Sequence, residues 1–207
     1  MAWRALLDLL FPAQCAVCNA LGSGLCPQCR PALQEICVRF PSLTVGALGP
    51  YEGNLRIAVL AVKDGRRDVA SALGELAAGL VAPASLLVPI PTTARRRRVR
   101  GVDGVALVAR RAAEIAGASV VPALEQWRGD AQRGRTRAAR LAARGRFACD
   151  PAAVAQRRVT LFDDVCTTGA TLTDCAAAVR AAGGRVEDAV VLAVTKSAPP
   201  WRTPPAN

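Results

Sequence analysis

The sequence predicts an α/β protein, in which helices flank a mostly parallel sheet and a small metal-binding segment precedes it. Three observations lead to this prediction. Short apolar runs alternate with segments of helical period along most of the 207 residues. An apolar run ends in two carboxylates and continues through a hydroxyl-rich turn into a helix, at residues 159–171. Two Cys-x2-Cys pairs lie near the N-terminus.

The composition excludes some chemistry and leaves the partner open. A hydrophobic content of 52% is ample for a core. The chain has no histidine, which excludes Ser-His and Cys-His catalysis and any histidine-containing metal site. The net charge of +11 favours polyanionic partners such as nucleic acid or a phosphorylated substrate. However, all but Lys63 and Lys196 of the 27 basic residues are arginine, a bias that GC-rich coding alone would also produce.

No membrane-spanning segment is predicted. Every apolar run of spanning length is interrupted by a charge. Residues 1–11 contain Arg4 and Asp8, lack a small-residue cleavage site, and are typical of a short amphipathic helix rather than a signal peptide. We therefore expect a cytoplasmic protein.

Residues 1–42 form the predicted metal-binding segment. Two cysteine pairs with a glycine-rich reversal between them can place four thiolates around one Zn²⁺: Cys15, Cys18, Cys26 and Cys29. Metal binding would supply on the order of 10 kcal/mol of folding free energy to a segment too small to fold by apolar burial. Four thiolates leave no open position, so the zinc is expected to be structural. Two disulfides are the alternative, disfavoured in a chain without a signal peptide. Cys37 is expected to bind no metal.

Residues 43–196 form the predicted main domain, and its elements follow in order. Residues 41–50 are a linker that merges into a first strand. Helices are expected over residues 53–63 and 66–80, where apolar positions recur at helical spacing, and a buried strand over 86–90. A helix follows over 101–116, ended by Gly117, and then a short strand over 119–123.

The second half of this domain begins with a segment of weak pattern. Residues 126–146 are rich in arginine, glycine and glutamine, and they suit either a mobile basic lid over a phosphorylated substrate or disorder without function. A short Ala/Arg helix is expected before Phe147. The central strand and its helix follow, the helix ending at Gly183, and a last strand covers 186–194. Residues 197–207 contain four prolines and are predicted to be a flexible tail.

The chemistry is concentrated in residues 159–171. The carboxyl end of a strand in a parallel sheet faces the ligand crevice, so Asp163 and Asp164 are expected at its mouth. Backbone N–H groups, hydroxyls and the positive end of the following helix make an anion cradle of phosphate size, formed by Thr167, Thr168, Gly169, Ala170 and Thr171. Carboxylates accept hydrogen bonds from hydroxyls, and the cradle donates to phosphate, which together suit a ribose 5-phosphate.

Two alternatives apply to the same stretch. The aspartates could merely cap a helix after a buried strand. A nucleotide-hydrolase strand also ends in carboxylates, but neither lysine of this chain closes a Gly-x4-Gly-Lys-Ser/Thr loop.

Cys166 precedes the helix N-terminus, which is expected to lower its thiol pKa, although no base accompanies it.

A basic loop follows the strand at 86–90. Residues 95–98 are four consecutive arginines, and a loop at this strand's end faces the same crevice as the two aspartates. Arg95 and Arg96 are therefore candidates for contact with a pyrophosphate, which bidentate donors bind well. A solvated run of charge is the alternative for each single arginine.

Residues 159–171 resemble the phosphoribosyl pyrophosphate (PRPP) signature of type I phosphoribosyltransferases. The resemblance implies that Asp163 and Asp164 hold the ribose hydroxyls, with Val165 and Cys166 beside them, and that residues 167–171 hold the 5-phosphate. The order of motifs along nearly the whole chain is similar to that of the ComF (ComFC) family. These motifs are the cysteine pairs, Tyr51 with residues 63–65, residues 88–91 with the arginine loop, residues 101–103, residues 132–147 and residues 163–171.

The ComF resemblance implies a type I phosphoribosyltransferase fold with an N-terminal four-cysteine zinc ribbon, and Mg²⁺ bound with PRPP. It also implies, for some members, a role in taking up transforming DNA beside a competence helicase. The chain departs from the family at residues 101–104, where members commonly read Gly-Phe-Asn-Gln, and in the reduction of a further cysteine pair to Cys37. Two functions stay open: an enzyme that transfers phosphoribosyl to an unknown acceptor, and a binding module for single-stranded DNA with an idle or regulatory PRPP site.

Overall fold

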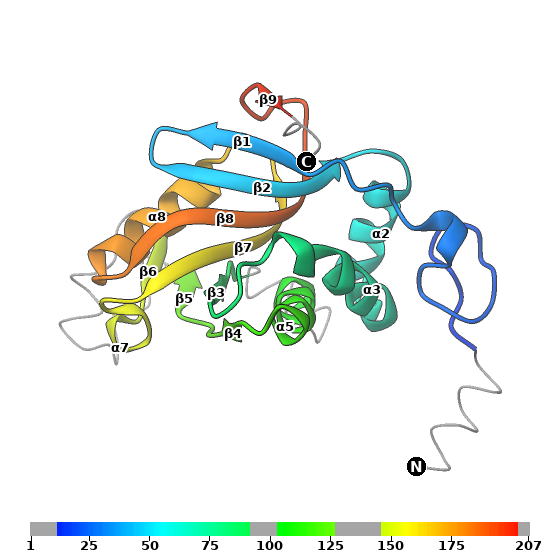
Figure 1. The fold of residues 1–207 in the computed structure, drawn as a ribbon, viewed down its shortest axis with the longest axis horizontal. Coiled ribbons are helices and arrows are strands. Elements are labelled where there is room, and N and C mark those ends of the chain that lie inside the picture. Colours follow the sequence, from blue (N-terminus) through cyan, green and yellow to red (C-terminus); the bar gives the residue numbers. More distant parts are fainter. Residues whose placement is uncertain (1–11, 92–102, 127–145, 203–207) are drawn as a thin grey trace, which may run out of the picture.

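The computed structural model describes residues 12–91, 103–126 and 146–202, and it contains a seven-stranded sheet (Figure 1). The order across the sheet is β4 (Ser119–Val120), β3 (Leu86–Pro89), β7 (Arg158–Cys166), β8 (Arg185–Val194), β2 (Leu43–Pro50), β1 (Ile36–Phe40) and β9 (Trp201–Arg202). The first five strands are parallel to one another, β1 is antiparallel to β2, and β9 is antiparallel to β1. The predicted α/β class with a mostly parallel sheet is confirmed.

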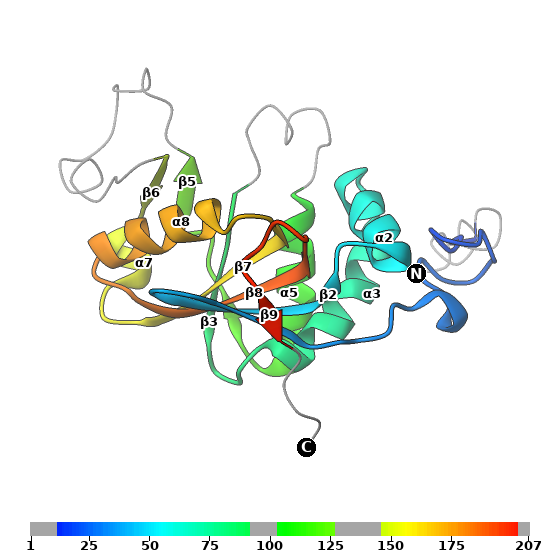
Figure 2. The same ribbon diagram turned by 90° about the horizontal axis from the view of Figure 1, so that it is seen from above.

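Helices cover both faces of this sheet (Figure 2). Helices α2 (Gly53–Lys63), α3 (Arg67–Ala77) and α5 (Gly104–Ala116) lie on one face, and α8 (Ala170–Ala181) lies on the other. The burial pattern of β7 explains the layering, because successive side chains point to opposite faces. Leu161 packs in the cluster that contains α8, whereas Phe162 packs in the cluster that contains α2, α3 and α5.

Shorter elements complete the described chain: η1 (Pro27–Cys29), η2 (Ala78–Leu80), α7 (Pro151–Val154), and a small antiparallel pair of β5 (Leu124–Gln126) and β6 (Phe147–Cys149).

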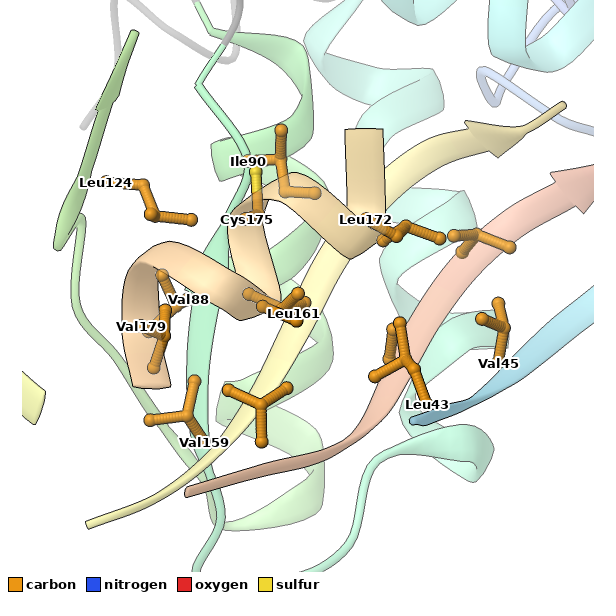
Figure 3. Packing of buried hydrophobic residues seen from close by; sticks show 14 of the residues in the cluster. Leu43, Val45, Val88, Ile90, Leu124, Val159, Leu161, Leu172, Cys175 and Val179 are labelled. Carbon is orange, nitrogen blue, oxygen red and sulfur yellow. The ribbon is translucent and has the colours of Figure 1, made fainter. Parts of the chain in front are cut away.

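The packing of α8 fixes the position of the loop that precedes it. Leu172, Cys175 and Val179 of α8 are buried against Val159 and Leu161 of β7 (Figure 3). Burying a side chain of the size of leucine or valine contributes roughly 1.5–3 kcal/mol. The spacing of three and four residues places all three on one stripe of the helix, as residues 170–181 predicted.

The connections around β3 and β7 create a switch point in the sheet. β3 leads to α5 on one face and β7 leads to α8 on the other, while β3 and β7 are neighbours. The amide of Ile90 donates to the carbonyl of Phe162 at 2.8 Å, so the contact between the strands continues one residue past Pro89, the last residue of β3. In open α/β sheets ligands bind at such a point, outside the carboxyl ends of the strands.

Most described elements match the prediction, and three do not. Residues 36–40 form a strand of the main sheet, between β2 and β9, although the sequence suggested only the end of the metal-binding segment. Trp201–Arg202 pairs with β1, where a flexible tail was expected. β5 and β6 pair across residues 127–145 and were not predicted as a unit. Each of these strands depends on a partner distant in sequence, which a local pattern does not reveal. The expected helix over residues 1–11 and the Ala/Arg helix before Phe147 lie outside the described residues.

Candidate functional site

The two carboxylates lie near the end of β7, at the switch point. The strand continues past them to Cys166, since β8 pairs with it as far as Cys166 and Val194. The sequence placed the turn directly after the carboxylates, and the longer strand instead holds Asp163 and Asp164 within regular backbone. Both residues are half-buried. Their orientation is therefore fixed by the sheet rather than by a loop.

The loop between β7 and α8 is short. Thr167 and Thr168 are exposed, and Gly169 is the N-cap of α8 with a φ of +79°. The amide of Thr173 donates to the carbonyl of Gly169 at 2.9 Å, which starts the helix. The first N–H groups of a helix lack intrahelical acceptors and attract anions. The predicted cradle thus consists of a three-residue loop and the first turn of a helix that contains Ala170 and Thr171.

Gly169 is favoured by contact as well as by backbone conformation. A Cβ at this position would lie 2.2 Å from Cε1 of Phe40, in β1, so that the ring would have to shift. An L-residue is also disfavoured at this positive φ. Strand β1, which follows the Cys-rich segment, therefore packs an aromatic ring against the candidate phosphate loop. Phe40 was not predicted as a site residue, because no local pattern links residue 40 to residue 169.

Asp163 is held in an environment that disfavours its charge. Burial, together with the neighbouring Asp164 carboxylate, raises the pKa of Asp163 to about 8. The amide of Asp164, which donates to Oδ1 of Asp163 at 2.8 Å, and the charge of Lys63 lower this pKa only in part. Burial and the neighbouring carboxylate therefore disfavour joint ionisation of Asp163 and Asp164, and a bound cation or hydrogen-bond donor would favour it.

Lys63 is a site residue to which the sequence analysis assigned no role. Its Nζ lies 3.1 Å from Oδ2 of Asp164, and both side chains are largely enclosed, with 29% and 22% of their surfaces exposed. The same Nζ lies 6.0 Å from the centre of the Tyr51 ring. Two signals in the sequence pointed to it: lysine is rare in this chain, and residues 63–65 belong, with Tyr51, to the motifs of the ComF resemblance.

The start of α5 closes the site from the side of β3. Asp103 caps this helix, its Oδ1 accepting from the amide of Ala106 at 3.3 Å. A Cβ on Gly104 would lie 2.6 Å from Cγ1 of Val62, so the start of α5 packs directly on the end of α2. The Asp103 charge also contributes to the raised pKa of Asp163. Charged groups from β7, from α2 and from the start of α5 therefore all influence the pKa of Asp163.

The thiols near the site are not activated nucleophiles. Burial, and then the nearby Asp163, raises the pKa of Cys166 to about 11, which corrects the expectation of a lowered value. A backbone hydrogen bond with Gly169 has the opposite sign but does not outweigh burial. Burial likewise raises the pKa of Cys175. Enclosure in the core raises the pKa of these thiols by more than the helix N-terminus lowers it.

The four predicted metal ligands lie together in the structure. The sulfur atoms of Cys15, Cys18, Cys26 and Cys29 are all within 4.8 Å of one another, and all four are free thiols rather than disulfides. Sγ of Cys18 lies 3.6 Å from Sγ of Cys26. Four thiolates at tetrahedral zinc–sulfur distances would be about 3.8 Å apart. The group can hold a metal ion.

The electrostatics of this cluster favour a cation. Burial alone would raise the pKa of Cys15, but backbone hydrogen bonds from Cys18, Cys26 and Val17 outweigh it and lower the pKa to about 6. The amide of Cys26 donates to this sulfur at 3.5 Å. By contrast, hydrogen bonds with neighbouring thiols, above all Cys18, raise the pKa of Cys29 to about 12. Four crowded sulfurs resist joint ionisation unless a positive charge lies between them.

The Cys-rich segment is packed on α2 and α3. Nδ2 of Asn54 in α2 donates to the carbonyl of Cys29 at 3.2 Å. Leu25 is buried in the core that contains α2 and α3. A Cβ on Gly24 would lie 2.7 Å from the amide nitrogen of Val69, so this backbone also approaches α3 closely. The segment is therefore part of one packed unit with the sheet.

Some predicted site residues lie outside the described part of the chain. These are Arg95 and Arg96, and residues 127–145 of the expected lid. Pro91 and Asp103, which flank residues 92–102, lie at the end of β3 and the start of α5. In the described residues, no helix is long and apolar enough to cross a membrane.

Comparisons with known proteins complete the description. No protein-family model matches the chain, and no curated protein matches it either. Among solved structures, it is similar to an allosteric regulatory enzyme of purine biosynthesis, with a TM-score of 0.41 and 23% identity over 60% of this chain and 26% of that one. It therefore spans about a quarter of that enzyme.

Two further solved structures are similar to the chain. A purine phosphoribosyltransferase from Pyrococcus horikoshii has a TM-score of 0.32 and 20% identity, over 70% of this chain and 76% of that one. The protein TT1426 from Thermus thermophilus has a TM-score of 0.33 and 18% identity, over 66% and 84% of the two chains.

Proposed function

We propose that the chain binds PRPP with Mg²⁺ and is a phosphoribosyltransferase that acts on an acceptor other than a purine base. One observation carries the proposal: adjacent carboxylates, Asp163 and Asp164, lie near the carboxyl end of a strand that leads through a short loop to a glycine-capped helix N-terminus, at the switch point of a parallel sheet. Carboxylates suit vicinal hydroxyls, and the loop suits a phosphate. A ribose 5-phosphate carries both groups at this spacing.

Each part of the site has a role in this proposal. Asp163 and Asp164 accept hydrogen bonds from the ribose hydroxyls, and residues 167–171 donate to the 5-phosphate. Carboxylate and phosphate oxygens are the ligands that Mg²⁺ prefers, and the bound ion would neutralise charge on the departing pyrophosphate. Arg95 and Arg96 are proposed to contact the same pyrophosphate.

The resemblance of the sequence to ComF proteins supports a structural zinc ion in the four-cysteine cluster. Zinc is the ion that four thiolates most commonly hold, and the sulfur separations fit it. We propose residues 1–42 as the zinc-ribbon segment, residues 43–196 as the phosphoribosyltransferase-like domain and residues 197–207 as a tail. A cytoplasmic location and a link to DNA uptake rest on the same resemblance.

The test is calorimetry with PRPP and Mg²⁺ on the wild-type chain and on a variant with Asp163→Ala and Asp164→Ala. We expect the double variant to lose binding. Ser42→Ala, at an exposed position before β2, is a control that should leave binding unchanged. Equal binding by the wild type and the double variant would contradict the proposed site, and no binding by the wild type would contradict the proposed ligand.

A nucleic-acid adaptor is the second candidate, favoured by the net charge of +11. Several described arginines are already paired with carboxylates, in the ion pairs of Arg30, Arg66, Arg111, Arg146 and Arg158. We therefore expect single-stranded DNA to bind with at most micromolar Kd and with a steep loss of affinity on adding salt, because phosphate contacts release counterions. Salt-independent binding measured by fluorescence anisotropy would support a dedicated DNA site instead.

A further inference from the structure

A cavity lies at the amino ends of the strands, away from the candidate site. Its volume is about 400 Å³, which is within the range of small-molecule sites. Its lining includes the turn at residues 82–85, which precedes β3, the start of β7 with Arg158 and Thr160, and Asp188 of β8. None of the residues proposed for PRPP lines it, because those residues lie toward the carboxyl end of β7.

Thr160 is a buried residue whose hydroxyl has no partner in the protein. Only 8% of its surface is exposed, and no other polar or charged residue of the described ranges is buried to this degree. Its hydroxyl makes no hydrogen bond to the described residues. Buried polar side chains are nearly always hydrogen-bonded. Since Thr160 lines the cavity, a polar molecule inside the cavity would supply the partner.

Ser85 contributes a second unpaired hydroxyl to the wall of the cavity. Its Oγ is enclosed and has no hydrogen-bond partner among the described residues. Its backbone, in contrast, is fully used: the amide donates to the carbonyl of Ala82 at 3.3 Å, and the carbonyl accepts from the amide of Ser119 at 3.0 Å. The preceding Ala84 has a φ of +57°, a left-handed conformation uncommon for an L-residue. Backbone strain of this kind is concentrated at ligand sites.

A bulge in the sheet places Thr160 beside Asp188. The register shifts by one residue between Val159 and Thr160, so that Thr160 pairs with Asp188 and Glu187 is the extra residue of β8. Bulges re-aim side chains and are common next to binding sites. Nη2 of Arg158 lies 3.1 Å from Oε2 of Glu187 and 3.5 Å from Oδ2 of Asp188. A carboxylate beside a hydroxyl suits hydroxyl groups of a ligand.

Arg157 gives the cavity a positive charge that no carboxylate neutralises. Its backbone is fixed, since its amide donates to the carbonyl of Val154 at 3.0 Å and its carbonyl accepts from the amide of Arg185 at 2.9 Å. Among the described residues, its guanidinium makes one hydrogen bond, of 3.4 Å to the carbonyl of Ala153, and no ion pair. A guanidinium with free donors binds phosphate in a bidentate manner.

We propose that this cavity is a second binding site, which takes a small phosphorylated sugar. The phosphate binds Arg157, and the sugar hydroxyls bind Asp188 and Thr160. The charge selects an anion, because Arg158 and Asp188 neutralise each other and Arg157 remains. The unpaired hydroxyls select a ligand with several hydroxyl groups rather than phosphate alone. The site goes beyond the proposed function and does not depend on PRPP binding at the carboxylates of β7.

The experiment follows the backbone amide NMR signals of the full chain during titration with glucose 6-phosphate, glucose and inorganic phosphate. Glucose 6-phosphate should shift the amides of Ser85, Thr160 and Asp188 in a saturable manner, with a Kd of about 1 mM or below. Glucose and inorganic phosphate each carry only part of the recognised groups. Each should therefore bind at least about tenfold more weakly.

Three variants separate the contributions of charge and hydroxyl. Arg157→Gln should weaken the binding of glucose 6-phosphate roughly 10- to 100-fold, because a charge-assisted hydrogen bond is lost. Thr160→Val keeps the β-branched shape and should weaken it roughly 3- to 10-fold. Arg39→Gln is the control, since it removes the same charge from an exposed position in β1 and should leave the Kd unchanged. Thermal unfolding shows whether each variant keeps the fold.

Several outcomes would overturn this proposal. One is the absence of shifts at the three amides, and another is equal affinity of the wild type and Arg157→Gln. Equal affinity for inorganic phosphate and glucose 6-phosphate would show that the hydroxyls are not recognised. Shifts confined to residues 163–173 would assign the sugar phosphate to the candidate site instead. If Thr160→Val does not fold, Arg157→Gln decides, because Arg157 is exposed. The calorimetry on Asp163 and Asp164 tests the proposed function separately.

Discussion

The ring of Phe40 lies directly against Gly169, so that a Cβ on residue 169 would be 2.2 Å from Cε1 and 2.3 Å from Cζ of the ring. The contact joins β1, near the N-terminus, to the loop that we propose for the 5-phosphate. Gly169 also has a φ of +79°. The backbone conformation therefore favours glycine here, and a larger residue would also have to displace the Phe40 ring.

Gly169→Ala should destabilise the fold by roughly 2–4 kcal/mol, combining backbone strain with overpacking. It should also abolish PRPP binding, because the loop must shift. Gly117→Ala is a matched control: its φ is +69°, but an added Cβ would meet nothing within 4 Å, so only about 1 kcal/mol should be lost. Chemical denaturation measures the loss of unfolding free energy in both variants. A double variant that combines Gly169→Ala with Phe40→Ala should regain the part of the unfolding free energy that overpacking removes. If the losses of unfolding free energy in the two single variants simply add in the double variant, the contact is contradicted.

The four-cysteine cluster should bind one equivalent of zinc per chain. Cys15→Ser and Cys29→Ser should lose the metal and unfold at lower temperature, because metal binding contributes folding free energy. Cys37→Ser is the control and should keep the metal, since Cys37 lies in β1 and is not in the cluster. Elemental analysis of purified protein decides the result. Full metal content in Cys15→Ser would refute the assignment of the ligands.

The pH dependence of stability should carry the signature of Asp163. Burial raises the folded-state pKa to about 8, above the value of an unfolded aspartate. Between about pH 4 and pH 8 the unfolded chain releases a proton that the folded chain keeps, so this group lowers the stability as pH rises, by at most roughly 1.4 kcal/mol per pH unit. Below about pH 4, Asp163 is protonated in both the folded and the unfolded chain, and its stabilising contribution relative to high pH is fully present.

Asp163→Asn should remove this slope, because asparagine imitates the protonated acid. Denaturation of the ligand-free protein at several pH values between about 4 and 9, which span the unfolded and folded pKa values, is the measurement. The variant should be more stable than the wild type at the upper end of this range and weaker in binding PRPP. Parallel pH profiles for the two proteins would show that Asp163 is not perturbed. Asp188→Asn is a suitable control, since Asp188 belongs to the same sheet but its side chain is 49% exposed.

Purine bases should not be acceptors. In the purine-salvage phosphoribosyltransferases that the signature resembles, an aspartate commonly occupies the first position of the phosphate loop and exchanges a proton with the base. That position here is Thr167, whose hydroxyl is not a base near neutral pH. Incubation with PRPP, Mg²⁺ and hypoxanthine, guanine or xanthine should release no appreciable pyrophosphate. Steady nucleotide formation would contradict this interpretation of the loop.

Local sequence patterns predicted the parts of the fold that depend on neighbours along the chain. Helix α5 shows this well: Val105, Val108 and Ala112 give the apolar stripe, and Gly117 ends the helix in the left-handed conformation. The four cysteines that lie together in the structure were predicted for the same reason, since each cysteine pair is a local turn. The α/β class followed from the alternation of such units.

What the sequence did not reveal depends on contacts between distant segments. The ion pair of Lys63 and Asp164 joins α2 to β7, and the contact of Phe40 with Gly169 joins β1 to the start of α8. No periodicity links these residues. The pKa of Cys166 was misjudged because a helix terminus is visible in sequence, whereas the degree of burial is not.

Helix α2 is attached at both ends to a candidate site. Asn54, in its first turn, donates to the carbonyl of Cys29 at 3.2 Å, and Lys63, its last residue, contacts Asp164 at 3.1 Å. We expect a helix with two such attachments to couple the four-cysteine cluster thermodynamically to the carboxylates. Such coupling is reciprocal. If removing zinc weakens PRPP binding by some factor, PRPP must tighten zinc binding by the same factor, and a chelator at equilibrium should remove less of the ion in the presence of PRPP.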